Sequence, residues 1–277
     1  MRKPGLIGRG VRLSAAAVAI AWSVFPIAMV VLSSFKPQRE IFAIPPNLVF
    51  SPTLDNYRRL LEEWPAFFPN MLNSLIVTAG ATLLTVAVST LAGYVYARFR
   101  GRALALSAFF MVVVRMLPPI VVTLPLFPLF SWLRVNDTHF VLIVLYAAFF
   151  VSLSTWIMRA FVDQVPRELE EAAFVDGASL GQVLRMVVLP LVLNGVIAAS
   201  LFVIVFAWNE FIFALVFTTR VARTTPLVMS EMLSTTDGVD WGVLFAAATV
   251  QLAPILAFIL AAQRYVIAGL AAGAVKG

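Results

Sequence analysis

Few side chains in this sequence could carry out covalent or metal chemistry. It has no cysteine, and His139 is its single histidine. The absence of cysteine excludes disulfides, thiolate metal sites and cysteine nucleophiles, and one histidine cannot build a metal site by itself. A phosphate-binding P-loop needs a lysine in the pattern Gly-x-x-x-x-Gly-Lys-[Ser/Thr], and Lys3, Lys36 and Lys276, the only lysines, lie in no such pattern. We therefore expect no catalytic residue, no metal site and no cofactor bound by this chain.

Two ionisable side chains, Arg115 and Glu210, lie inside long apolar runs. Placing a charge in the hydrocarbon core of a membrane costs about 2.5–3.5 kcal/mol on insertion scales. Each side chain is therefore expected to face the interior of the helix bundle, a water-filled cavity or the other charged side chain. The last case is the hypothesis of an Arg115–Glu210 ion pair. Trp208 and Asn209 precede Glu210, and an indole ring can stack on the C–H face of a sugar ring. These four residues either line a polar path through the membrane or hold helices together.

The segment between residues 159 and 190 carries its own helix signals. Pro166 suits the first turn of a helix, where a missing N–H costs nothing, and Gly177 suits a left-handed cap at its end. Three acidic residues lie near the positive end of this helix dipole: Glu168, Glu170 and Glu171. Ser179 can then cap a second short helix, which we expect to end before Pro190. The two helices are expected to meet at a glycine corner.

The first of these short helices has an apolar side. Its members are Leu169, Ala172, Ala173 and Phe174. They would be exposed to solvent unless something packs on them, and an exposed apolar patch of this kind often marks a partner site.

Most of the chain that must position these residues is apolar. The sequence is 61% hydrophobic and only 12% charged, with a mean hydropathy of +0.96, whereas about a quarter of a soluble domain is charged. Crossing the hydrocarbon core takes about 20 apolar residues in a helix. Six runs meet this requirement, over about residues 13–34, 71–97, 103–130, 140–158, 191–218 and 243–265. We predict an all-α membrane protein with six transmembrane helices; the alternating strands of an outer-membrane barrel are missing.

Basic residues orient these spans. With the N-terminus inside, twelve of the 20 basic residues lie on inner segments and seven on outer ones, while Arg115 lies inside the third run. Because basic residues favour the cytoplasmic side, both termini and residues 159–190 are expected to be cytoplasmic. The cluster Arg98, Arg100 and Arg102 is the firmest single signal. The net charge of +6 is thus explained by topology and gives no reason to expect nucleic-acid binding.

Three details complete the predicted topology. Pro118 and Pro119 are expected to bend the third span, as a gating kink or as a static feature. The outer segment 36–69 is too polar and proline-rich to cross lipid, and residues 54–63 within it are expected to form a short amphipathic helix. The run at 13–34 is too long for the apolar region of a signal peptide, so we expect it to be retained.

The inner segment carries a specific resemblance. Glu171-Ala172-Ala173, then Gly177 and then Leu189-Pro190 resemble the EAA motif of ABC importer permeases. Three residues separate Ala173 from Gly177 and eleven separate Gly177 from Leu189, which agrees with the motif. Val187 stands where the family usually has isoleucine, a change that keeps β-branching.

Other segments are similar to permeases of the maltose type. They are residues 33–37 (Ser-Ser-Phe-Lys-Pro), 55–57 (Asp-Asn-Tyr), 207–210 (Ala-Trp-Asn-Glu) and the ending 269–277. The similarity covers nearly the whole chain. It implies the type I ABC importer permease fold, with a bacterial inner-membrane location and an oligosaccharide, polyol or glycerol phosphate as solute. Residues 1–70 would form the cytoplasmic tail, first transmembrane helix and long periplasmic loop, and 71–277 the core permease domain.

The resemblance also implies a larger machine. A solute-binding protein would deliver solute from outside, a second homologous permease would complete a heterodimer, and two copies of a cytoplasmic ATPase subunit would bind ATP and Mg. A coupling helix at about 166–178 would seat in a cleft of one ATPase. The residues implied in coupling are Glu170, Glu171, Ala172, Ala173, Phe174, Asp176, Gly177, Leu189 and Pro190. Those expected along the translocation path are Trp208, Asn209, Glu210 and Arg115.

Two other classes of function are possible from the residues alone. Six spans with one coupling-type inner loop argue against an ion-gradient-driven secondary transporter, as does the expected lack of paired broken helices. A membrane-embedded enzyme would need a reactive constellation inside the spans, and the sequence has no His–Glu pair, cysteine or paired aspartates there.

Overall fold

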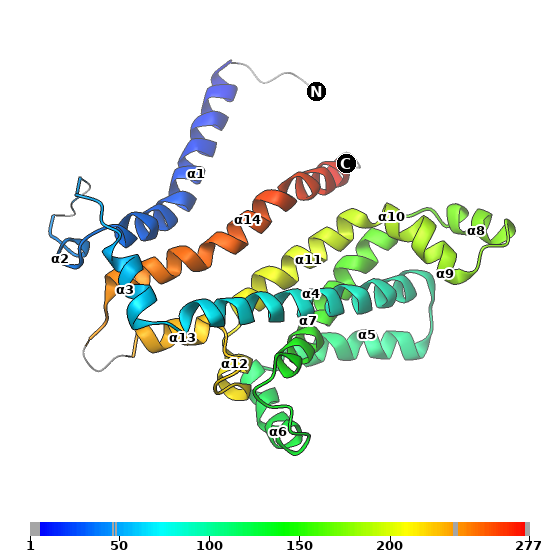
Figure 1. Ribbon diagram of the computed structural model, residues 1–277. Coiled ribbons are helices and arrows are strands. Elements are labelled where there is room, and N and C mark those ends of the chain that lie inside the picture. The colour runs from blue at the N-terminus through cyan, green and yellow to red at the C-terminus, as the bar shows by residue number, and fades with distance from the viewer. Residues whose placement is uncertain (1–5, 46, 48, 235–237, 275–277) are drawn as a thin grey trace. The chain divides into compact units, whose positions relative to one another are not determined.

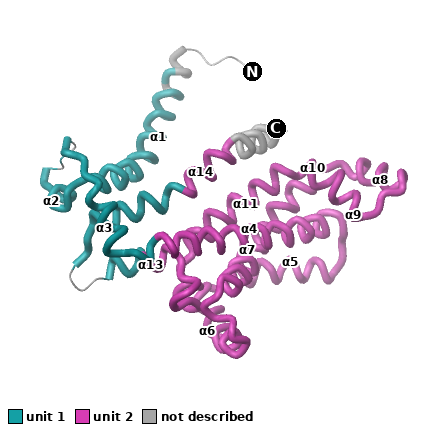
Figure 2. The backbone as a smooth tube through the Cα atoms, in the orientation of Figure 1, with its two compact units in different colours: residues 1–67, 229–253 teal, residues 68–228, 254–277 magenta. Residues whose placement is uncertain are grey.

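The computed structural model describes residues 6–45, 47, 49–234 and 238–274, and this part of the chain is helical without strands (Figure 1). Four helices are long and apolar enough to cross a membrane, and the number rises to six if each of two bent helix pairs is one span. The prediction of an all-α membrane protein is therefore confirmed. The chain divides into two compact units, residues 1–67 with 229–253 and residues 68–228 with 254–277 (Figure 2).

The first unit consists mostly of the chain's N-terminal helices. They are α1 (Leu6–Ser34), α2 (Gln38–Ile41) and α3 (Asp55–Glu63), joined by the end of α13 (Thr225–Met232) and the first part of α14 (Trp241–Ala274). The buried Asn56 organises this unit, because its side-chain amide donates to the carbonyls of Ser34 and Lys36, at 2.8 Å each. The prediction of a short helix over residues 54–63 is confirmed by α3.

The second unit holds most of the remaining helices. In chain order they are α4 (Phe67–Arg98), α5 (Arg102–Arg115), α6 (Pro119–Trp132), α7 (His139–Val162), α8 (Arg167–Val175), α9 (Leu180–Gln182), a π-helix (Val183–Val188), α10 (Leu189–Leu191), α11 (Leu193–Trp208) and α12 (Ile212–Phe217).

Helix α7 is the axis of the second unit, and two apolar clusters lie along it. The first joins its N-terminal half to α4, α11 and α12 through residues such as Tyr146 and Phe213. The second joins its C-terminal half to α4, α11 and the π-helix. At Gly93 of α4 an added Cβ would lie 2.7 Å from the Met158 Cβ and 2.9 Å from the Arg159 backbone nitrogen. Only glycine allows α4 and α7 to pack this closely.

The third expected span is bent, as its prolines predicted. Helices α5 and α6 meet at an angle of 100°. Pro118 precedes α6 and Pro119 is its first residue, a position where the missing proline N–H costs nothing. The break predicted at these prolines is therefore confirmed, and the predicted run 103–130 corresponds to the two helices α5 and α6.

The expectation of one continuous fifth span over 191–218 is wrong, because this run is interrupted twice. The chain bends by 76° at Val192, and α11 ends at Trp208 before α12 begins at Ile212. The Glu210 carboxylate accepts the backbone N–H groups of Phe213 and Ala214, at 3.0 and 3.4 Å. It therefore caps the start of α12, and such a cap favours a new helix over continuation of the old one.

Candidate functional site

Helix α8 and its glycine corner form the candidate site. The helix begins directly after Pro166, one residue later than expected, and ends at Val175. Gly177 has φ +85°, its N–H donates to the Phe174 carbonyl at 3.0 Å, and the next N–H, that of Ala178, donates to the Ala173 carbonyl at 2.9 Å. These two bonds define a Schellman cap, which requires a left-handed residue at this position. The structure thus places Gly177 as predicted.

The second short helix starts as predicted and ends later. Ser179 and Gln182 form a capping box, with the Ser179 N–H donating to the Gln182 side-chain oxygen at 2.8 Å. The helical stretch then passes through a π-helix and includes Leu189 and Pro190 before it breaks at Val192. The expectation that it ends before Pro190 is wrong. Proline has no N–H to donate to the carbonyl of residue i−4. The π-helix that ends at Val188, just before Leu189 and Pro190, uses bonds between residues i and i+5 instead.

One residue of the predicted coupling segment faces inward. Glu170 is only 4% exposed. Its Oε1 accepts from Nε of Arg98 at 2.7 Å and lies 2.6 Å from Nη2 of Arg98, while its Oε2 accepts from the Tyr94 hydroxyl at 2.8 Å. Both partners belong to α4. The buried carboxylate is thus paired and hydrogen-bonded, as a buried charge requires.

Arg98 and Arg167 strengthen this connection. Arg98 Nη2 also donates to the Val165 carbonyl at 2.8 Å, just before α8. In return, Arg167 at the start of α8 donates to the carbonyls of Ala97 and Arg98 at 3.4 Å each. These are the terminal carbonyls of α4, which basic side chains satisfy favourably. The cluster Tyr94, Arg98, Glu170 and Arg167 is called the inner clamp below.

The other side of α8 is exposed and partly apolar. Leu169, Phe174 and Val175 are 46%, 45% and 88% exposed. The remaining predicted coupling residues on this side are also exposed: Glu171, Ala172, Asp176 and Gly177. Ala173, by contrast, packs against the apolar cluster at the C-terminal half of α7. One face of α8 therefore packs against other helices of this chain, and its other face is exposed.

The four residues expected along a translocation path do not form one cluster. Arg115 donates to the Phe149 carbonyl at 3.1 Å and lies over the rings of Phe149 and Phe202, at 5.2 and 5.6 Å. Glu210 caps α12 instead. Within the described residues no ion pair joins Arg115 to Glu210, so that hypothesis is wrong: each charge is satisfied by other groups.

Trp208 and Asn209 lie at the end of α11. Trp208 is 3% exposed, so its indole is not available as a stacking surface in this conformation. Asn209 is exposed, and its side-chain amide donates to the Val205 carbonyl at 2.8 Å. It therefore helps to satisfy the last carbonyls of α11.

Sequence reasoning missed a polar hub at Asp137. Its carboxylate accepts the backbone N–H groups of four consecutive residues, 219–222, at 3.0–3.2 Å. Burial raises the pKa of Asp137, but these backbone donors outweigh it and lower the pKa to about 2. Nearby, Asn73 donates to the carbonyls of Val221 and Arg223 and contacts His139 at 2.8 Å. A single aspartate in the sequence gave no reason to expect that the segment at Asp137 would contact residues 219–222.

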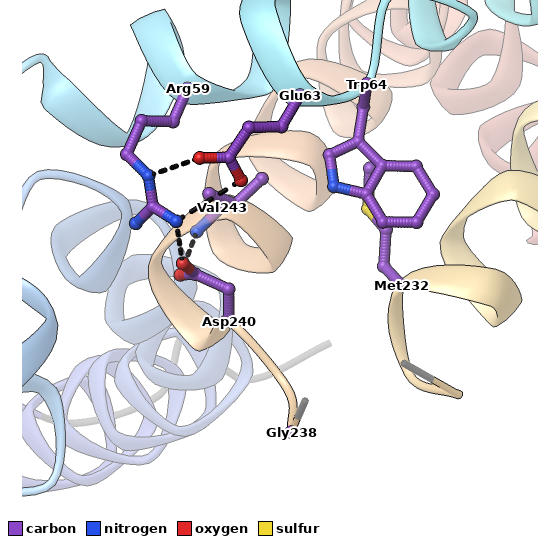
Figure 3. A pocket seen from close by; sticks show the side chains of 7 residues that line it. All are labelled: Arg59, Glu63, Trp64, Met232, Gly238, Asp240 and Val243. Carbon is purple, nitrogen blue, oxygen red and sulfur yellow. Dashed lines mark hydrogen bonds and ion pairs between the residues drawn. The ribbon is translucent and has the colours of Figure 1, made fainter. Parts of the chain in front are cut away.

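A polar cavity in the first unit was also missed. It measures about 470 Å³ and is lined by Arg59, Glu63, Trp64, Met232, Gly238, Asp240 and Val243 (Figure 3). Arg59 binds Glu63 at 2.8 Å and Asp240 at 2.5 Å. Its hydrogen bond to Glu63 raises the pKa of Arg59 despite partial burial. Because one guanidinium pairs with a carboxylate of α3 and with the carboxylate directly before α14, this group links α3 to the start of α14.

Together these features define a class of protein. The chain is an integral membrane protein of apolar helices, two of its candidate spans are broken, and a short helix between α7 and α11 presents a partly apolar face.

The comparison with known sequences identifies the family. Residues 86–271 match the family described as binding-protein-dependent transport system inner membrane component, and the chain belongs to this family. It is 37% identical to a probable ABC transporter permease protein, y4oR, of Sinorhizobium fredii, over 91% of this chain and 90% of that one. It is 34% identical to the trehalose/maltose transport system permease protein MalG of Thermococcus litoralis, over 91% of each chain.

The fold agrees with solved transporters. A chain of a bacterial ABC transporter involved in import of the acidic polysaccharide alginate superimposes with a TM-score of 0.75, over 96% of this chain and 99% of that chain. The sequence identity is 16%, so this likeness establishes the fold alone.

Proposed function

We propose that this chain is the membrane permease subunit of an ATP-driven importer, and that α8 docks it to a separate ATPase. One observation carries the proposal: the EAA segment folds into a helix anchored on one face, with Leu169, Phe174 and Val175 exposed on the other. Exposed apolar side chains grouped in this way are typical of partner sites. The partner contact residues would be Glu171, Ala172, Phe174, Asp176 and Gly177.

A sugar or sugar-like molecule is the proposed solute. Relatives named for trehalose/maltose, trehalose and sulfoquinovosyl glycerol transport support this class, at 34%, 32% and 31% identity. Asn209 and Glu210, at the break between α11 and α12, are the proposed path-lining residues because polar groups and irregular backbone at membrane depth normally line a cavity. Trp208 and Arg115 are proposed to position that break.

The remaining parts of the importer are proposed as separate chains. ATP and Mg would be bound by two copies of an ATPase subunit, because this sequence has no P-loop, and this chain would perform no catalysis itself. A second permease and a solute-binding protein would complete the assembly. The distribution of basic residues supports a cytoplasmic position for both termini and for α8. The family resemblance supports a bacterial inner-membrane location, and residues 71–277 are the proposed core permease domain.

Reconstitution into vesicles tests this function. The chain with its partner permease, ATPase and binding protein should take up a radiolabelled oligosaccharide only when MgATP is supplied on the α8 side. Gly177→Asp should insert into the membrane normally but lose ATPase association and stimulated hydrolysis, because aspartate adds a charge and a side chain at the exposed corner. Uptake by this chain alone, driven by an ion gradient, would contradict the proposal, as would normal transport by the Gly177→Asp variant.

A further inference from the structure

We propose that two adjacent glutamates of the EAA segment have separate tasks: Glu171 serves the partner, and Glu170 is a positioning residue that transmits movement of α8 to α4. The inference rests on the proposed function, since movement of α8 requires an ATPase bound to it. It adds a route for that movement inside this chain. The route is the inner clamp and not the peptide connections at either end of α8.

The side chains of Glu170 and Glu171 point in different directions, and this difference separates their tasks. Successive residues of a helix point about 100° apart, so adjacent glutamates can lie on different faces. Glu170 is buried against α4, whereas Glu171 is exposed. A docking ATPase can reach Glu171 directly and cannot reach Glu170 without dismantling the inner clamp.

The geometry of the inner clamp links movement of α8 to movement of α4. Arg98 meets one carboxylate oxygen of Glu170 with two nitrogens, at 2.7 and 2.6 Å, and Tyr94 holds the other oxygen at 2.8 Å. The Arg98 and Glu170 side chains are 8% and 6% exposed. Charge-assisted bonds to a planar guanidinium fix direction as well as distance, and burial keeps salt and water from weakening them. A displacement of α8 must therefore carry the C-terminal end of α4 with it.

Stability alone gives a poor reason for this pair. Buried ion pairs often contribute little compared with apolar residues of similar volume, because desolvation offsets their attraction. A contact that holds two helices in one register depends more on directional bonds than on apolar packing. Helix α4 continues from the clamp as a 32-residue helix, so it is a suitable lever, and Gly93 packs it directly on α7.

The absence of cysteine from this sequence makes a direct test available. Val95→Cys places a single nitroxide label on an exposed position of α4, directly after Tyr94 and about one turn before Arg98. The intact complex with partner permease and ATPase would be studied in lipid vesicles with and without MgATP. Two measurements are taken: retention of the ATPase on the purified complex, and the ATP-dependent change in label mobility. Glu170→Gln is compared with its neighbour, Glu171→Gln, as matched control.

We expect Glu170→Gln to retain the ATPase as the unmodified chain does. It should reduce the ATP-dependent change in label mobility by about fivefold or more, since about fivefold is the lower end of the coupling usually found between two sites. Glu171→Gln should weaken ATPase retention and leave the signal per bound ATPase unchanged. If Glu170→Gln does not fold, Arg98→Lys decides, because it keeps the charge while losing the paired donors. An unchanged signal at α4, or a loss of retention equal to that of Glu171→Gln, would overturn the inference. Failure of the unmodified chain to bind any ATPase would instead contradict the proposed function.

Discussion

The carboxylate of Glu170 and the guanidinium of Arg98 form a buried ion pair at 2.6 Å, although the two residues are 72 positions apart in the chain. Arg98 ends α4, and Glu170 lies in the first turn of α8. The pair therefore fixes a short inner helix against the end of a long apolar one. This contact separates the anchored face of α8 from the face available to a partner.

Gly177 is expected to tolerate asparagine better than alanine. Its φ of +85° costs an ordinary L-residue about 1–2 kcal/mol, while asparagine enters this region more readily. Gly177→Ala should accelerate amide hydrogen exchange at the end of α8 by about 5–30-fold, which corresponds to that free energy. Gly181→Ala is the control, because it has no positive φ and nothing within 4 Å of an added Cβ. Equal exchange in the two alanine variants would show that the left-handed cap is unimportant.

Asp137 is expected to stabilise the segment from 219 to 222. Asparagine at this position keeps the left-handed preference that φ +59° demands but loses the charge that attracts four backbone donors. We expect Asp137→Asn to lower the free energy of unfolding in detergent by about 1 kcal/mol. Asp163→Asn is a suitable comparison, because among the described residues that carboxylate forms just one partly exposed ion pair, with Arg159 at 3.5 Å. A stability change no larger than that of Asp163→Asn would contradict the role of Asp137.

The same aspartate predicts a pH dependence. Its pKa in the folded protein is about 2, lower than the value of about 3.9 in an unfolded chain. Its contribution to stability is therefore complete above pH 4 and is lost as the pH falls through about 2. The melting temperature of the unmodified chain should fall more steeply than that of Asp137→Asn over this range. Parallel curves for the two proteins would count against the lowered pKa.

Asp240 has two separable functions in the first unit. It pairs with Arg59 (Figure 3) and accepts the backbone N–H of Val243 at 3.2 Å, which caps the start of α14. The ion pair is partly exposed, so Asp240→Asn should cost less than about 1 kcal/mol. Asp240→Ala also removes the cap and should cost about 1 kcal/mol more. Thermal unfolding in detergent measures both, and identical melting temperatures for the two variants would exclude a capping role.

Features that depend on neighbouring residues could be predicted from the sequence. The apolar runs indicated the membrane helices, Pro118 and Pro119 indicated a bend, and the spacing of Gly177 and Ser179 indicated the corner between two short helices. Each of these signals acts through the backbone of its own segment. The EAA segment also led to the candidate site, whose role in coupling stays a prediction.

Features that depend on distant partners could not be predicted in this way. Arg115 and Glu210 looked like a pair because both are charges in apolar runs, but backbone groups and aromatic rings satisfy them separately. Glu170 looked like its exposed neighbours because nothing local distinguishes it. Only packing of α8 on α4 decides that it is buried, and Arg98 was interpretable from sequence only as a topology signal.

Cross-linking from one exposed position of α8 tests the central claim most directly. Val175 is 88% exposed at the end of α8, and Val221, 65% exposed between α12 and α13, is an apolar control. In membranes that contain the whole transporter, Val175→Cys with a short photoactivatable cross-linker should form a product with an ATP-hydrolysing subunit, identified by mass spectrometry. Val221→Cys should form none. Absence of the ATPase product from Val175→Cys, or equal yields from both positions, would contradict the assignment of α8 as the docking helix.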